Sequence, residues 1–272
     1  LNWDVNKEEL VSITGKKTGS MGVFRSDNDK WLGTTSPVYN PYQNKELVVT
    51  LVEASTNIGL EITDGGIIKS GKKIYLQMQL PDESIGNSVV KSSITALNSH
   101  NGQGSVAFGS TNEVAKRQNM FYKTYHEIQK FRHSSSVYDK IKIAVSELKN
   151  AIESDKKLMQ TFKIMASMPI KDELVHKILK KAFLIDLNEK DKKRDRRDVI
   201  LAAIEEEKSL EGNTIWALFN GVTGYTNHGI KFKGSKEDNY MAGAGYAANL
   251  SAFNTIMSWI EEETHKVAPI NA

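Results

Sequence analysis

The feature that most constrains the fold of this chain is a change in hydrophobic pattern near residue 112. Before it, short runs of strand-forming residues are separated by turn residues, among them Pro81-Asp82 and Asn101-Gly102. After it, apolar residues recur at the spacing of long helices. This order predicts an α+β protein with a mostly antiparallel N-terminal sheet and packed helices, followed by a helical C-terminal half.

We expect residues 1–135 to form an α+β domain with an antiparallel sheet, and residues 136–272 to form a helical region packed on it as one compact unit. Alternate residues of the run 73–80 are apolar, which predicts one buried face and one polar face. The Asn101-Gly102 pair predicts a tight hairpin turn between the last two strands. The expected strands are residues 21–25, 34–39, 60–62, 73–80, 91–99 and 105–109, and the expected helices are 43–57, 113–130, 137–165, 172–183, 196–208, 214–223 and 237–263.

A basic and aromatic segment lies within the stretch 91–136. Between Lys116 and His133, five Lys and Arg residues stand against one Glu, and aromatic residues lie between them. Cations neutralise phosphates and rings offer stacking faces, with each stacked base worth about 1–3 kcal/mol. This pattern indicates a nucleic-acid surface. The alternative is an amphipathic helix whose apolar side faces a core and whose lysines are solvated.

Three groups of residues are candidates for such a surface. Phosphate contacts are expected from the cations and a histidine of the segment, stacking from one of two rings, and further contacts from the sheet side. The phosphate-contacting candidates are Lys116, Arg117, Lys123, Lys130, Arg132 and His133. The stacking candidates are Tyr122 and Phe131, and the candidates on the sheet side are His100, Lys91 and Arg25.

Composition narrows the classes of function. The net charge of +3 is small, so attraction to an acidic partner has to come from local clustering. The chain has no cysteine, which excludes disulfides and cysteine nucleophiles and fits the cytoplasm of a bacterial host cell. The sequence contains no run of 18 apolar residues, so we expect no membrane-spanning helix. P-loop, dinucleotide, zinc-helix and nucleophile-elbow motifs are all missing, so we expect no cofactor, no metal and no assigned catalytic residue.

Three C-terminal patterns have structural interpretations. The small residues at 243–245 predict close packing against a neighbouring helix, with a phosphate loop as the alternative. The acidic run 205–207 is interpreted as a solvated helix face. Trp216, Phe219 and Val222 are expected in the core of a helix that ends at Gly224. The alternative there is a substrate-facing turn that presents residues 227 and 228.

An ordered set of short motifs spans nearly the whole chain. It comprises LNWDV, SPVYNPYQNKEL, GKKIYLQMQLP, LNSHNGQGSV, KRQN, FRHS, WALFNGVTGYTNH and SAFNTIMSW. In this order the chain resembles a phage/plasmid-like protein family of unknown function. More remotely, that family is similar in layout to the single-strand annealing proteins of phage recombination, the Redβ, RecT and Erf groups. These set a small antiparallel sheet against a long helix, oligomerise, and hold single-stranded DNA by its backbone.

Two kinds of function follow as hypotheses. The first is a non-enzymatic mobile-element protein that binds single-stranded DNA or RNA, promotes strand annealing or recombination, and forms homo-oligomers. The second is a protein-binding or homo-oligomeric assembly module, for example an antagonist of host defence with a host protein as partner. A metal-dependent nuclease with a site assembled from scattered residues is a third alternative. Fold resemblance alone does not decide between them.

Overall fold

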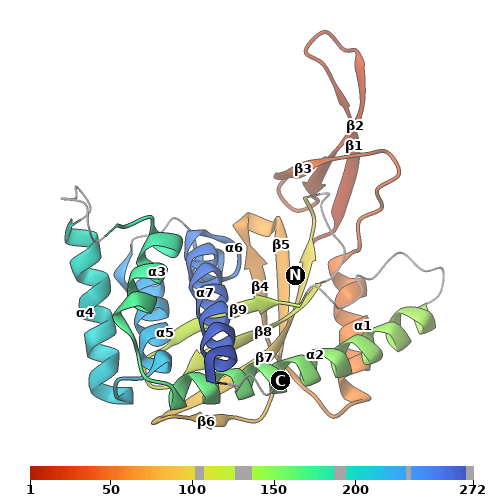
Figure 1. The fold of residues 1–272 in the computed structure, drawn as a ribbon. Helices are drawn as coiled ribbons and strands as arrows, with labels where there is room; N and C mark the ends of the chain where they lie inside the picture. Colours follow the sequence, from red (N-terminus) through yellow and green to blue (C-terminus); the bar gives the residue numbers. More distant parts are fainter. Residues whose placement is uncertain (102–106, 126–136, 187–193, 231–233, 268–272) are drawn as a thin grey trace, which may run out of the picture. The chain divides into compact units, whose positions relative to one another are not determined.

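The computed structural model describes residues 1–272 except 102–106, 126–136, 187–193, 231–233 and 268–272 (Figure 1). The chain divides into two compact units. Unit 1 consists of residues 1–81, 92–111 and 124–156, and unit 2 of residues 82–91, 112–123 and 157–272. The boundary expected after residue 135 lies outside the described residues. The predicted α+β class is confirmed, with sheets in the N-terminal half and helices in the C-terminal half.

The strands of the described residues form two sheets. In the first, β1 (Val5–Val11), β2 (Lys17–Arg25) and β3 (Trp31–Thr35) pair antiparallel in that order. The second sheet has the order β4-β5-β7-β8-β9, with β6 also paired to β7. Its strands are β4 (Ile62–Ile68), β5 (Lys73–Gln79), β6 (Glu83–Ile85), β7 (Ser88–Ser99), β8 (Ala107–Val114) and β9 (Asn119–Thr124). A short 3-10 helix, η1 (Lys69–Gly71), connects β4 to β5.

Unit 1 has its own hydrophobic core. Helix α1 (Asn44–Thr56) buries Leu47, Leu51 and Ala54, which recur at helical spacing, so the helix predicted at 43–57 is confirmed. These side chains pack with β5 and β7 and with Ala144, Leu148 and other residues of α2 (Val137–Ser167). Burial of these apolar side chains is the main term that stabilises the unit.

Strand β5 differs from the expected pattern. Its apolar face is buried as predicted, but Tyr75 and Gln77 of the opposite face are also buried. The Tyr75 hydroxyl donates to Oδ2 of Asp64 at 3.2 Å, and the Gln77 amide donates to Oγ1 of Thr95 at 3.3 Å. The opposite face is polar as predicted, and two of its side chains are nevertheless buried, because cross-strand partners satisfy their polar groups.

The segment predicted as a helix at 113–130 instead forms the end of β8 and all of β9 as far as Thr124, and its remainder, from residue 126, lies outside the described residues. A four-residue turn at 115–118 joins the two strands. In this turn the amide of Gln118 donates to the carbonyl of Val114 at 2.7 Å, and Gln118 has a left-handed φ of 55°. Val114 and Phe121 are buried, so tertiary burial outweighs the weak helical periodicity read from the sequence.

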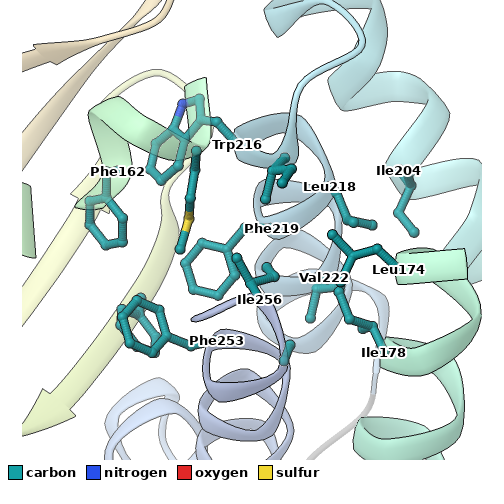
Figure 2. Close-up of a cluster of buried hydrophobic side chains, with 14 of the residues drawn as sticks. Phe162, Leu174, Ile178, Ile204, Trp216, Leu218, Phe219, Val222, Phe253 and Ile256 are labelled. Atoms are coloured by element: carbon teal, nitrogen blue, oxygen red, sulfur yellow. The ribbon is translucent and has the colours of Figure 1, made fainter. Parts of the chain in front are cut away.

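Unit 2 is mostly helical. It contains the end of α2 and the elements α3 (Asp172–Phe183), α4 (Arg194–Glu211), α5 (Ile215–Gly224), the π-helical turn η2 (Tyr225–Gly229), α6 (Lys236–Ala242) and α7 (Ala244–Val267). Figure 2 shows α5 at the centre of the core, with Trp216, Phe219 and Val222 directed toward α2, α3 and α7. These three side chains are at most 2% exposed, which confirms the predicted core helix and its end at Gly224.

The single helix predicted at 237–263 is two helices, α6 and α7, separated at Gly243. The side-chain oxygen of Asn239 accepts the backbone N–H of Gly245 at 3.1 Å and so caps the start of α7. A Cβ atom on Gly243 would lie 2.7 Å from the carbonyl oxygen of Asp238. Gly243 is the C-cap of α6, so this contact lies within its own helix. The predicted close packing against a neighbouring helix holds for Gly245 of α7, where a Cβ atom would lie 2.6 Å from Oδ1 of Asn239 in α6.

Candidate functional site

The residues predicted for nucleic-acid binding do not all lie on a surface. Lys91 on β7 and Lys116 in the β8–β9 turn are exposed. Arg25 and His100 are buried in unit 1. Four further candidates, Lys130, Phe131, Arg132 and His133, lie outside the described residues.

Arg25 is held by its surroundings in unit 1. Its Nη2 lies 2.6 Å from Oδ2 of Asp27 and its Nε donates to Oδ1 at 2.9 Å, a two-point contact. The guanidinium also lies 4.4 Å from the centre of the Trp3 ring. The hydrogen bond from Arg25 lowers the pKa of the Asp27 carboxyl. The charge of Arg25 thus has partners within its own unit, which differs from the expected phosphate contact.

His100 is fully buried, which also differs from the expected surface position. Its Nε2 lies 2.8 Å from Oδ1 of Asn44, and the Asn44 amide nitrogen donates to the carbonyl of Trp3. Since Oδ1 accepts, Nε2 carries the proton in this arrangement. Burial lowers the pKa of His100 to about 4, so the ring is neutral at physiological pH.

Tyr122 and Lys123 on β9 both contact α7. Tyr122 is 1% exposed, and its ring centre lies 5.9 Å from that of Tyr246. The ammonium of Lys123 lies 4.8 Å from the centre of the Phe253 ring. A buried Tyr122 does not offer a stacking face, but its ring packs against the more exposed ring of Tyr246.

Tyr246 borders an open groove along α7. The groove has a volume of about 500 Å³ and is lined by Lys181 of α3 and by seven residues of α7, namely Tyr246, Ala247, Leu250, Ser251, Asn254, Thr255 and Ser258. Among the described residues, this lining contains one cation, one phenol ring, one amide and three aliphatic hydroxyl groups, and it contains no carboxylate. Such a surface favours an anionic or uncharged polar partner.

Arg117 lies in a different environment of unit 2. Its Nη2 donates to Oε1 of Glu211 at 2.8 Å and to Oγ of Ser88 at the same distance. Its Nε lies 2.9 Å from Oε1 of Glu207, close enough for an ion pair but not aligned for a hydrogen bond. The two glutamate side chains are 7% and 0% exposed. Arg117 was expected to contact phosphate, but its charge is compensated by two buried carboxylates.

The two carboxylates are satisfied to different degrees. Glu211 accepts hydrogen bonds from Arg117, from the hydroxyl of Ser88 and from the backbone N–H of Asn87. Oε1 of Glu207 accepts from the amide of Asn119 at 2.9 Å, whereas Oε2 has no hydrogen-bond partner among the described residues. Burial raises the pKa of the Glu207 carboxyl, although the charge of Arg117 and the hydrogen bond from Asn119 lower it.

A cavity of about 440 Å³ lies beside this cluster. Its walls come from the β8–β9 hairpin, from α4 and α5, and from η2, whose π-helical geometry is frequent at functional sites. It is lined by Arg117, Asn119, Val199, Ala203, Glu206, Glu207, Asn220, Gly221, Gly224, Tyr225, His228 and Gly229. Of the two polar residues named for a possible substrate-facing turn, His228 lines the cavity, whereas Asn227 is buried and donates to the carbonyl of Met120.

Sequence reasoning missed the acidic side of this site. The run 205–207 was interpreted as solvated, and Glu205 and Glu206 are indeed exposed, but Glu207 is 5% exposed. Three consecutive helical residues point in different directions, so one member of an acidic run can face inward. The apolar residues Ile200 and Ile204 lie seven and three positions earlier on α4 and are buried. This spacing is the signal that places Glu207 on the inner face.

Two further observations concern the part of the chain that the structure describes. No three His, Asp or Glu side chains there gather closely enough to hold a metal ion. None of the helices there is long and apolar enough to cross a membrane.

The fold and these two sites define an α+β protein with a polar groove on its last helix and a charged cavity beside a β-hairpin turn. Residues 31–244 match the family described as Domain of unknown function (DUF932), and the chain belongs to this family. The resemblance to a family of unknown function is thereby confirmed. No curated protein and no solved structure matches the chain.

Proposed function

We propose that this protein binds single-stranded nucleic acid along the α7 groove and acts, without being an enzyme, in strand annealing or recombination of a mobile element. The observation that carries the proposal is the combination of Lys181 and the Tyr246 ring in a groove that no carboxylate of the described residues lines. Tyr122 and Lys123, both predicted from sequence as nucleic-acid contacts, support this helix from β9.

The chemistry of the groove suits a single strand. The Lys181 ammonium offers a charge-assisted hydrogen bond to a phosphate, worth about 1.5–3 kcal/mol. Tyr246 is only partly buried and offers a ring for a base to stack on. The amide of Asn254 and the hydroxyls along α7 can bond to sugars or base edges, which are accessible in an unpaired strand.

The cavity beside Arg117 is less suited to nucleic acid. Its lining includes the carboxylates of Glu206 and Glu207, which repel phosphates, and the charge of Arg117 is already compensated. We therefore place the nucleic-acid contact on α7 and assign Lys91 and Lys116, which are exposed, to supporting contacts at most.

Fluorescence anisotropy with a labelled single-stranded oligonucleotide and a matching duplex, titrated at several salt concentrations, tests this proposal. We expect tighter binding of the single strand and a linear fall of log K with log salt, by about 0.7 for each phosphate contacted. Lys181→Glu should weaken binding about tenfold or more and lower the slope by about 0.7. Tyr246→Ala should weaken binding by about 1–3 kcal/mol with an unchanged slope.

The matched control is Lys157→Glu, because Lys157 is also exposed in unit 2 and does not line the groove. This variant carries the same change of charge and should bind like the wild type. Equal losses for Lys181→Glu and Lys157→Glu would mean that only net charge matters and would exclude the groove. Absence of binding at low salt would overturn the proposal as a whole.

A second candidate function is homo-oligomeric assembly, and one observation favours it. Ala247, Ser251 and Asn254 are small or uncharged and follow one side of α7 at helical spacing, where another helix can approach closely. The molecular mass in solution, measured by light scattering, separates the two functions. If Tyr246→Ala reduces the mass and leaves oligonucleotide affinity unchanged, the groove is an assembly surface.

A further inference from the structure

We infer that the cavity beside Arg117 is a binding site for a small organic cation that carries a primary ammonium or guanidinium group. This inference is independent of the proposed nucleic-acid function, because it concerns other residues of unit 2. It rests on the charge balance of the cavity, on one unsatisfied carboxylate oxygen, and on the chemistry of the cavity walls.

The charge balance comes first. Arg117 is the one cation that lines the cavity among the described residues, apart from the titratable His228, and Glu211 pairs with it from behind. Glu211 alone compensates the charge of Arg117, so the carboxylate of Glu207 is in excess. Glu206 adds a further carboxylate at the exposed rim of the cavity. Arg196 bonds the hydroxyl of the lining residue Tyr225, and even with this second guanidinium the three carboxylates are in excess. Such a balance favours cations over phosphates.

The unsatisfied oxygen indicates where a donor is needed. Glu207 is 5% exposed and lines the cavity, yet its Oε2 has no hydrogen-bond partner among the described residues. A buried carboxylate oxygen without a donor is costly, and native structures usually supply one. The terminal torsion of a glutamate is soft, so a small rotation turns Oε2 toward a ligand. An ammonium or guanidinium offers both the donor and the opposite charge.

The walls favour an organic ligand. A volume of about 440 Å³ is far larger than a single ion requires and lies within the usual range of small-molecule sites, about 300–1,000 Å³. Val199 and Ala203 provide apolar contacts for an alkyl chain, and Tyr225 adds an aromatic side chain to the same wall. Asn119 and Asn220 are buried side-chain amides at the inner end, where they can fix the orientation of a polar head group.

Binding should depend on pH in a defined direction. Among the described residues, the charged and titratable groups that act on Glu207 or share its cavity are Arg117 from the hairpin turn, Glu206 and Glu211 from α4, and Tyr225 and His228 from η2, with Arg196 bonded to the Tyr225 hydroxyl. Burial raises the pKa of Glu207, and a bound cation favours its ionised form. Affinity should therefore increase as pH rises and Glu207 ionises. Glu207→Gln should remove this part of the pH dependence.

The experiment uses agmatine as a probe, because it carries a guanidinium at one end and an ammonium at the other. Isothermal titration calorimetry on the full chain should give saturable binding of one equivalent, and agmatine should raise the melting temperature. Nα-acetyl-arginine amide tests whether the same group on a peptide is accepted. Glu207→Gln should weaken agmatine binding about tenfold or more, as expected for loss of a buried charged partner.

Two variants make the result specific. Glu205→Gln is the matched control, because Glu205 is exposed on the same helix, pairs with Lys208 and does not line the cavity. It should bind agmatine like the wild type. If Glu207→Gln does not fold, Glu206→Gln at the rim provides the second test and should weaken binding several-fold. Equal affinity in wild type and Glu207→Gln, or stabilisation by inorganic phosphate or magnesium chloride but not by agmatine, would overturn the inference.

Discussion

At the scale of single residues, His100 makes the stability of unit 1 sensitive to pH. Its ring is buried and neutral, its Nε2 is bonded to Asn44, and its Nδ1 has no hydrogen-bond partner among the described residues. A neutral imidazole fits this environment, whereas an imidazolium would lie in the core with an added proton and no acceptor for it. Protonation therefore opposes folding of unit 1.

We expect acid to destabilise the protein through this residue. The folded-state pKa of His100 is about 4, below its ordinary value of 6.5, so its contribution is complete above pH 6.5 and is lost as pH falls through 4. The loss amounts to about 3 kcal/mol. Urea unfolding between pH 7 and 4 measures it, by comparing wild type with His100→Gln. Parallel stability curves for the two proteins would contradict the assignment.

The candidate site shows what single residues reveal from sequence alone. The cationic character of Arg117 is evident from its segment, and the structure brings it together with Glu211, a partner 94 positions away. No local pattern encodes such a pairing, because it depends on how α4 packs beside the hairpin. For the same reason the sequence does not reveal the partner role of Glu207, which lies in an acidic run typical of a solvated helix face.

At the scale of elements, the predictions succeed where local signals agree. Helix α3 begins and ends where predicted, with acidic residues in its first turn and Lys180 and Lys181 in its last, as the helix dipole favours. The prediction of one helix over α6 and α7 is wrong because the side chain of Asn239 takes the N–H of Gly245. That bond competes with the helical ladder, and periodicity does not reveal it.

Contact between α4 and α5 depends on Gly221. A Cβ atom there would lie 2.6 Å from Cα of Ile204, a backbone atom that cannot turn away. Gly221→Ala should therefore separate the helices and destabilise the protein by about 1–3 kcal/mol, despite the better helix propensity of alanine. Chemical denaturation followed by circular dichroism measures this change.

The control for this prediction is Ala202→Ser on the exposed side of α4, which should change stability by less than about 0.5 kcal/mol. An increase in stability of Gly221→Ala would show that the two helices have room for a methyl group.

At the scale of the whole molecule, neither compact unit is one continuous segment of chain. Each unit is assembled from three segments, and strands β7, β8 and β9 and helix α2 contain residues of both. A cut at one position therefore does not release an intact unit. From sequence, the α+β class and most of the helices were predictable. Strand β9, which was expected to be part of a helix, and this interleaving were not, because both depend on which strands pair.

We expect the two units to unfold together. Continuous strands that belong to both units transmit the loss of structure from one to the other. Hydrogen exchange in increasing denaturant tests this by comparing the amides of β5 in unit 1 with those of α5 in unit 2. Both sets should lose protection at the same denaturant concentration. Earlier exchange of either set would show that the units open independently.

The attachment of Arg117 to α4 has a practical consequence for protein engineering. The turn 115–118 has to keep its length, because one inserted residue would move the guanidinium away from Glu207 and Glu211. The β1–β2 turn is different, since residues 13–16 are exposed and Ile13 has no side-chain burial at all. An affinity tag or a fluorescent label therefore belongs between Thr14 and Gly15 and not in the β8–β9 turn.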